Sequence, residues 1–300
     1  MRIRQALQQA RTLGVSRLDA QLLLVHVLGR PREWLLAHDD ERLEPGLAER
    51  WHELLARRAA GVPLAYLVGE REFHGLRLEV TPAVLVPRPE TEILVDWALE
   101  LLPDAPSATA VDLGTGSGAI ALALKASCPA VALAASDCSA AALAVAQRNA
   151  RTHRLDVEFA QGDWWAAWPG RRFGLAAANP PYVASDDPHL AALTHEPRAA
   201  LTPEGDGQAA LRCIVAAAPE HLQPGAWLLL EHGHDQAEAV ARALAQRGFV
   251  SVSTRPDLAG LPRCTGAQWP GVQSCRPVVV MPKVTAQAAP GGCPGSQCGA

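Results

Sequence analysis

The chain has 300 residues, of which 49% are hydrophobic, which is enough to bury the core of one domain of ordinary size and a smaller one. Its formal net charge of -4 at pH 7 argues against nucleic acid as a stable partner, because proteins that bind many phosphates usually carry a basic excess. The seven cysteines are an odd number in a chain without a signal-peptide pattern, which does not indicate a disulfide framework, and they include no Cys-x-x-Cys pair, so no metal site is predicted.

Residues 1–63 are predicted to form a small helical domain. The first residues lead into an amphipathic pattern rather than the apolar run of a signal peptide. Apolar side chains recur at helical spacing in residues 18–28 and again in residues 47–55. Gly29 is expected to end the first of these helices.

Residues 64–92 are predicted to link this domain to the rest of the chain. Residues 73–80 alternate in polarity about Gly75, as a β-hairpin would. Pro87 and Pro89 then make a stiff corner, and a helix is expected to follow from residue 93.

Residues 93–282 are predicted to form a second domain in which strands and helices alternate. That alternation indicates an α/β fold of the Rossmann-like kind, with a mostly parallel sheet that is covered by helices on both faces. Residues 283–300 are rich in Gly, Pro, Gln and Ala and are predicted to be a disordered tail. The candidate strands are residues 109–113, 131–136, 157–161, 173–178, 227–231 and 250–254.

The most apolar stretch of the chain, residues 119–135, lies within this second domain. It contains Lys125 and Pro129, and it is too short and too interrupted to span a bilayer. A cytoplasmic protein with no membrane contact is therefore expected.

A glycine-rich turn follows the first candidate strand and opens a helix. Its G-x-G-x-G spacing differs from the G-x-G-x-x-G of dinucleotide sites, and it lacks the Gly-Lys-Ser/Thr of a phosphate-binding loop. Such glycines let the backbone turn tightly and let a ligand approach closely. The residues predicted to contact a cofactor here are Gly114, Thr115, Gly116, Ser117 and Gly118.

Two further positions complete a predicted adenosine pocket. Asp137 ends the second candidate strand, where a carboxylate can accept hydrogen bonds from both ribose hydroxyls; the alternative is that it caps the next helix. After the third strand, Asp163 can bind the exocyclic amine of adenine and Trp164 can cover the ring, although Trp164 and Trp165 can also be core residues. Nothing in this set is suited to a pyrophosphate, which favours S-adenosylmethionine as the cofactor.

The tetrapeptide after the fourth strand, Asn179-Pro180-Pro181-Tyr182, is the predicted reacting site. An amide nitrogen is a poor nucleophile, so an enzyme that methylates it must mainly orient it and polarise its two N–H groups. The side-chain oxygen of Asn179 and the backbone carbonyl of Pro180 can be the two acceptors, while Tyr182 can lie flat against the amide. No general base is evident, and water can take the released proton.

These residues resemble the protein-glutamine methyltransferases that modify peptide chain release factors, often called PrmC or HemK. The resemblance covers residues 18–269 and is most specific in the Pro-Arg-Pro-Glu-Thr-Glu corner at residues 87–92; Glu196-Pro197 also belongs to it. It implies a seven-stranded methyltransferase sheet, an N-terminal domain that helps to hold the release factor, and the glutamine of a Gly-Gly-Gln tip as target. It also implies that Asn179 contacts the cofactor and that residues 179–182 contact the substrate.

Three other functions remain open from the residues alone. The tetrapeptide also suits a nucleic-acid amino methyltransferase of the adenine N6 type. Such an enzyme must extract its target base from the nucleic acid, and the sequence shows no basic region with interspersed aromatic residues that could do so. A glutamine methyltransferase that acts on a ribosomal protein is a second alternative. The sequence distinguishes it from an enzyme that acts on release factors only through the family resemblance. A small-molecule binding module has no need for the tetrapeptide. We expect a monomer whose partner is a release factor.

Overall fold

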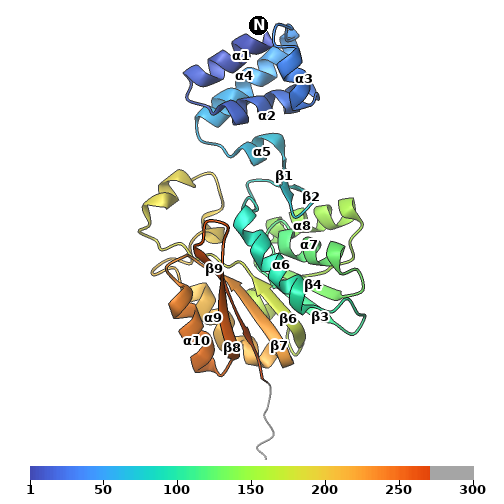
Figure 1. The fold of residues 1–300 in the computed structure, drawn as a ribbon, viewed down its shortest axis with the longest axis vertical. Helices are drawn as coiled ribbons and strands as arrows, with labels where there is room; N and C mark the ends of the chain where they lie inside the picture. The colour runs from blue at the N-terminus through green and yellow to red at the C-terminus, as the bar shows by residue number, and fades with distance from the viewer. Residues whose placement is uncertain (271–300) are drawn as a thin grey trace, which may run out of the picture.

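The computed structural model describes residues 1–270, which form a small helical lobe and a larger α/β lobe joined by a narrow connection (Figure 1). The predicted end of the second domain at residue 282 and the predicted tail at 283–300 lie outside the described residues. Within residues 1–270, no helix is both long enough and apolar enough to cross a membrane.

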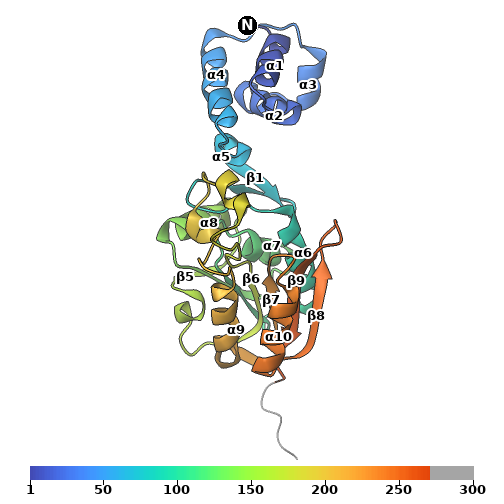
Figure 2. The same ribbon diagram turned by 90° about the vertical axis from the view of Figure 1, so that its left-hand side faces the viewer.

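The helical lobe is built from four helices around one apolar core. Leu23, Leu24 and Trp51 are completely buried there. Gly29 adopts a left-handed conformation (φ 61°) directly after the second helix, so the predicted helix end is confirmed. The helices are α1 (Ile3–Thr12), α2 (Arg17–Leu28), α3 (Arg32–Ala37) and α4 (Pro45–Ala59), followed by the short α5 (Leu64–Val68), which leads out of the lobe (Figure 2).

The predicted hairpin is confirmed and is fastened to the α/β lobe. Strands β1 (Glu70–Phe73) and β2 (Leu76–Glu79) pair in antiparallel fashion about His74 and Gly75. The buried Asn149 side chain accepts a hydrogen bond from the backbone N–H of Glu79 and donates one to its carbonyl. The proline corner then forms the short helix η1 (Pro89–Thr91), which runs into α6 (Glu92–Leu101).

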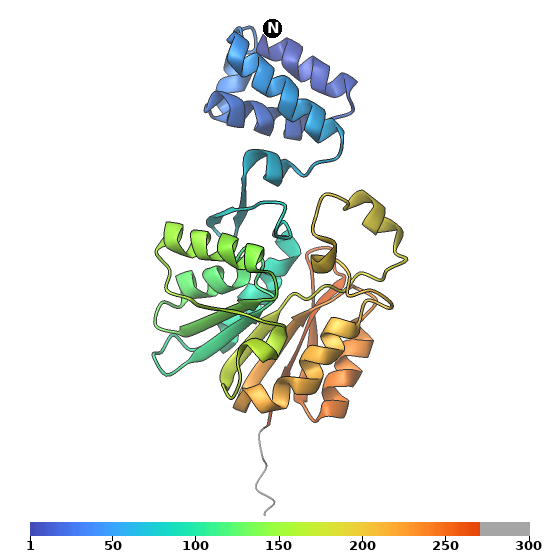
Figure 3. The ribbon, with the colours of Figure 1, turned by 180° about the vertical axis from the view of Figure 1, so that it is seen from behind.

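The α/β lobe contains the expected seven-stranded sheet (Figure 3). Its order is β5-β4-β3-β6-β7-β9-β8, and only β9 runs antiparallel to its neighbours. The sequence pattern left β9 unassigned, and β7 begins earlier than predicted. The strands are β3 (Thr109–Leu113), β4 (Ala132–Asp137), β5 (Glu158–Gln161), β6 (Phe173–Ala178), β7 (Leu222–Glu231), β8 (Val250–Pro256) and β9 (Pro262–Gln268).

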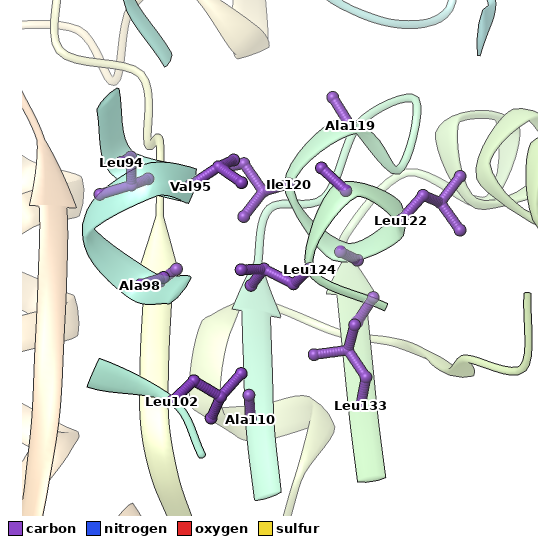
Figure 4. Packing of buried hydrophobic residues seen from close by; sticks show 14 of the residues in the cluster. Leu94, Val95, Ala98, Leu102, Ala110, Ala119, Ile120, Leu122, Leu124 and Leu133 are labelled. Carbon is purple, nitrogen blue, oxygen red and sulfur yellow. The ribbon is translucent and has the colours of Figure 1, made fainter. Parts of the chain in front are cut away.

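Helices cover both faces of this sheet because its strands alternate their buried side chains. On β3, Ala110 packs under α6 and α7 (Figure 4), whereas Val111 and Leu113 face the second core on the opposite side. The order of strands reverses direction between β3 and β6, and ligands of such sheets bind at the carboxyl ends there. The remaining helices are α7 (Ala119–Ser127), α8 (Ala140–His153), α9 (Ala209–His221) and α10 (Ala237–Arg247), with short helices η2 (Trp164–Ala167), η3 (Pro188–Ala192) and η4 (Arg198–Ala200).

Candidate active site

A cleft opens at the carboxyl ends of β3, β4 and β6, where the ligand was expected from the sequence. It encloses about 1120 Å³, including space open to solvent. Within residues 1–270, no cluster of three or more His, Cys, Asp or Glu side chains is arranged to hold a metal ion. The predicted site residues that line the cleft are Gly114, Thr115, Gly116, Ser117, Asp137, Trp164, Asn179 and Pro181, whereas Gly118, Pro180 and Tyr182 lie outside its lining.

The glycine-rich turn adopts backbone angles that favour glycine. Gly114 has φ 77° and Gly116 has φ 56°, both in the left-handed region. A Cβ atom on Gly114 would lie 2.9 Å from the ring of Trp164, so the packing of this ring also excludes a side chain at this position. A Cβ atom on Gly116 would meet nothing within 4 Å, so that backbone stays open to a ligand.

The Asp137 carboxylate braces this turn from the end of β4. One oxygen accepts a hydrogen bond from the backbone N–H of Gly116 (2.9 Å) and the other from that of Ser139 (2.9 Å). The interpretation of Asp137 as the cap of the next helix is wrong, because Ser139 caps α8 by accepting from the N–H of Ala142. Asp137 therefore connects the glycine turn to the start of α8 while it lines the cleft.

The two neighbouring tryptophans have different environments. Trp165 is buried and donates its indole N–H to the carbonyl of Ile214 (2.9 Å), so the core interpretation is confirmed for it. Trp164 is half-buried and lines the cleft with the exposed Asp163. Its φ of 48° is unusual for a tryptophan and aims the ring over Gly114.

The tetrapeptide after β6 is held by side chains that the sequence pattern did not identify. The Asn179 side-chain nitrogen donates to the hydroxyl of the buried Thr91 (3.1 Å), and this directs its carbonyl oxygen away from Thr91. The Tyr182 hydroxyl donates to the carboxylate of Glu231 (3.2 Å). The side-chain amide of Gln236 donates to the Tyr182 backbone carbonyl (2.9 Å) and so fixes the end of the segment.

Sequence signals for these missed residues exist, although they are indirect. Thr91 lies inside the proline corner that carries the family resemblance, and Glu231 is a charged residue at the end of a run of buried leucines. A charged side chain that ends an apolar strand is exceptional in a core and marks a candidate functional position.

An ion pair connects two motifs that are distant in the sequence, the proline corner and Glu196-Pro197. Arg88 donates to Glu196 (2.6 Å), and the second oxygen of Glu196 accepts from the backbone N–H of Val86 (3.1 Å). The Glu196 side chain is only 2% exposed. The pair therefore holds the segment after β6 against the proline corner at the rim of the cleft.

Asp112, beneath the glycine turn, gives the fold a testable pH dependence. Burial raises the pKa of this fully buried carboxyl to about 7, against opposing hydrogen bonds from Thr115 and Ala121. Because its pKa is raised, the folded protein binds the proton of Asp112 more tightly than the unfolded chain does. The stability that this difference contributes is fully present below about pH 4 and is lost as the pH rises to about 7.

We expect Asp112→Asn to flatten the decrease in the free energy of unfolding between pH 5 and pH 7.5. The amide keeps an acceptor for Thr115 and cannot ionise, so it removes a slope of up to about 1.4 kcal/mol per pH unit. Urea unfolding at several pH values measures the two slopes. Equal slopes in the variant and the wild type would contradict the assignment of this titration to Asp112.

Comparisons with known proteins show which proteins the chain is similar to in sequence and in fold. The family model described as PrmC N-terminal domain matches residues 1–69, and that described as Methyltransferase small domain matches residues 91–209. The chain is 50% identical over 256 residues to a release factor glutamine methyltransferase of Bordetella pertussis, covering 84% of this chain and 95% of the relative. It is 48% identical over 276 residues to that of Burkholderia pseudomallei, covering 89% and 96%. A solved methyltransferase from Pyrococcus furiosus, 18% identical, shares the fold with a TM-score of 0.51 over 66% of this chain and 90% of that chain.

Proposed function

The chain belongs to the release factor glutamine methyltransferase family, and we propose that it methylates the side-chain amide nitrogen of the glutamine in the Gly-Gly-Gln tip of peptide chain release factors. The observation that carries this proposal is the placement of Asn179. Its side-chain nitrogen is engaged by Thr91 at the edge of the cleft, so its oxygen is available as an acceptor for an incoming amide.

The cleft fits S-adenosylmethionine as the methyl donor. That cofactor supplies a methyl group on a sulfonium, which is already strongly electrophilic. Gly116 offers backbone that no Cβ obstructs, Asp137 offers a carboxylate for hydroxyl groups, and Trp164 offers a flat apolar ring. These residues match an adenosine with a short amino-acid arm and include no cradle for a pyrophosphate.

We expect Asp137→Ala to weaken the binding of S-adenosylmethionine about 10- to 100-fold, measured by calorimetry. The variant removes an acceptor for the ribose and also releases the N–H of Gly116, and each charged hydrogen bond contributes about 1.5–3 kcal/mol. Asp156→Ala is the matched control, since Asp156 is an exposed carboxylate outside the cleft. An unchanged affinity in Asp137→Ala would leave Asp137 with only a bracing role.

In the proposed reaction the protein mainly orients the glutamine amide. One amide N–H donates to the Asn179 oxygen and the other to the Pro180 carbonyl, which directs the nitrogen lone pair at the methyl carbon. With the donor bound, the lone pair would form the new nitrogen–carbon bond as the methyl carbon–sulfur bond breaks and its electron pair stays on sulfur, and the nitrogen would then lose one proton to water. Tyr182 supports the plane of the amide, and its own hydroxyl is held by Glu231.

The two lobes have separate proposed roles. We propose that residues 1–63 act as the release-factor-binding helical domain, residues 64–92 as the hairpin linker, and the described part of the chain from residue 93 to residue 270 as the methyltransferase domain. The linker brings Thr91 and Arg88 to the cleft, so it also completes the reacting site. We propose that the enzyme acts as a cytoplasmic monomer on free release factors.

The proposal is tested by incubating the protein with labelled S-adenosylmethionine and three candidate substrates in parallel: release factors, ribosomal proteins and DNA. Mass spectrometry then locates the methyl group. We expect label on the glutamine of the Gly-Gly-Gln tip. Label confined to a ribosomal-protein glutamine or to adenine would replace this function with one of the two alternatives.

A further inference from the structure

Glu231 lies at the end of β7, behind the tetrapeptide, and in the proposed reaction it serves only as the acceptor of the Tyr182 hydroxyl. It is 1% exposed and follows three completely buried leucines, Leu228 to Leu230. A carboxylate in such a position is costly unless its neighbours compensate for its desolvation. Its presence there calls for a role that an apolar residue cannot fill.

The two oxygens of Glu231 differ in their contacts: one holds the tyrosine end of the tetrapeptide, and the other is an unpaired buried acceptor. Oε1 accepts the hydroxyl of Tyr182 at 3.2 Å. Oε2 is buried and makes no hydrogen bond of ordinary length within residues 1–270. The hydroxyl of Thr91 acts on the same carboxyl group as a hydrogen-bond donor and lowers its pKa.

Thr91 connects this carboxylate to Asn179. The Thr91 oxygen accepts the side-chain N–H of Asn179, so the Thr91 proton is free to point to another acceptor. Among the described residues, Glu231 Oε2 is a buried acceptor that lacks a partner. The three groups therefore form a series of amide, hydroxyl and carboxylate, in which the Asn179 amide donates to Thr91 and the Thr91 hydroxyl acts on the carboxyl group of Glu231.

The groups around Glu231 keep it close to its ionised form at slightly alkaline pH. Burial raises the pKa of Glu231 to about 7, and Thr91, Arg263 and Tyr182 oppose that rise while Glu90 adds to it. Arg263 is itself held by Asp257 at 3.1 Å. Above pH 7 the carboxylate can accept from both hydroxyls at once, whereas a protonated carboxyl has to donate through one oxygen.

We propose that Glu231 is a positioning residue for both ends of the tetrapeptide: it orients Tyr182 directly and Asn179 through the neighbouring hydroxyl of Thr91. It touches neither substrate nor cofactor. Its effect is to set the direction of the acceptor oxygen of Asn179 and the plane of the Tyr182 ring together, so that a single buried carboxylate aligns both. The inference rests on the proposed amide methylation for its consequence in catalysis, but not for its geometry.

The kinetic test uses Glu231→Gln, Thr91→Val and the double variant at pH 8, with labelled S-adenosylmethionine and release factor. We expect each single variant to lower kcat about 10-fold and to leave KM and cofactor affinity within about twofold, because orientation is lost while binding is kept. The double variant should be about as slow as Glu231→Gln, because both changes break one chain. Glu220→Gln, an exposed carboxylate on α9, is the control that should leave kcat unchanged.

A kcat within about twofold of wild type in Glu231→Gln would overturn the proposal. So would a double variant whose loss is the product of the single losses, about 100-fold, because the two residues would then act independently.

A second measurement decides the geometry without any turnover. The side-chain amide cross-peak of Asn179 in a nitrogen-15 correlation spectrum is assigned from its loss in Asn179→Asp. We expect it to move in both Glu231→Gln and Thr91→Val and to stay in place in Glu220→Gln. An unmoved peak in Glu231→Gln overturns the connection, whereas failure of the wild type to methylate any release factor would overturn the proposed function and leave this measurement valid.

Discussion

The Asn179→Ala variant is expected to lower the kcat of methyl transfer about 100- to 1,000-fold and to leave the affinity for S-adenosylmethionine within about threefold. Truncation removes the acceptor that orients the glutamine amide, and it also leaves the buried Thr91 hydroxyl without its donor. The loss should fall on kcat because the Pro180 carbonyl and Tyr182 alone leave the weakly nucleophilic nitrogen without its second N–H acceptor. Single-turnover methylation of a release factor and calorimetry with the cofactor measure the two effects.

Controls separate orientation from general damage in this experiment. Gln147→Ala removes a side-chain amide from an exposed position on α8, outside the cleft, and should keep full activity. The melting temperature of Asn179→Ala should fall by only a few degrees, as expected when about 1 kcal/mol of hydrogen bonding is lost. Turnover close to wild type would show that the amide is oriented by the backbone alone.

The strands of the α/β lobe were predictable to the extent that their apolar patterns were local. Strands 109–113 and 173–178 have the predicted bounds, because strands buried on both faces are mostly apolar, with Asp112 as the exception in the first. β9 could not be found in this way, since it contains Pro262 and Gly266 and has few apolar side chains. It becomes a strand by pairing with β7 and β8, a tertiary contact that no local pattern reports.

Gly266 shows why β9 resists prediction. A Cβ atom there would lie 2.5 Å from Leu229 and 2.6 Å from the ring of Trp97. Glycine usually weakens a strand, but here it leaves room on β9 for the side chains of Trp97 on α6 and Leu229 on β7. The residue that argues against a strand in the sequence is required by the packing of that strand.

The residues of the candidate site also fall into two groups, those that a local sequence pattern reveals and those whose partners are distant in the sequence. The glycine turn, Asp137 and the tetrapeptide were predictable because each follows a strand within a few residues. Thr91 and Glu231 were not, since Thr91 meets its partner across 88 residues of sequence and Glu231 meets its partner across 49. What the fold adds to the sequence is the set of buried groups that hold the reacting residues in place.

The Gly114→Ala variant should weaken the binding of S-adenosylmethionine about 30- to 100-fold. An alanine at φ 77° costs roughly 1–2 kcal/mol, and its Cβ atom would lie 2.9 Å from the Trp164 ring. The free protein can relieve this by moving the turn or the ring, whereas cofactor binding requires both to return. The backbone strain and the contact with Trp164 together then make the free energy of cofactor binding less favourable by about 2–3 kcal/mol. Each 1.4 kcal/mol corresponds to a factor of ten in affinity.

Gly46→Ala is the matched control, since Gly46 lies on α4 with ordinary backbone angles, and a Cβ atom added there would have no neighbouring atom within 4 Å. Calorimetry should find its cofactor affinity unchanged. The contact with the ring can be separated from the backbone strain by repeating Gly114→Ala in a Trp164→Ala background. The added cost should be smaller there, because only the strain at φ 77° remains. An equal cost in both backgrounds would show that the ring of Trp164 does not determine the shape of this turn, and the position of Gly114 would then rest on its backbone angles alone.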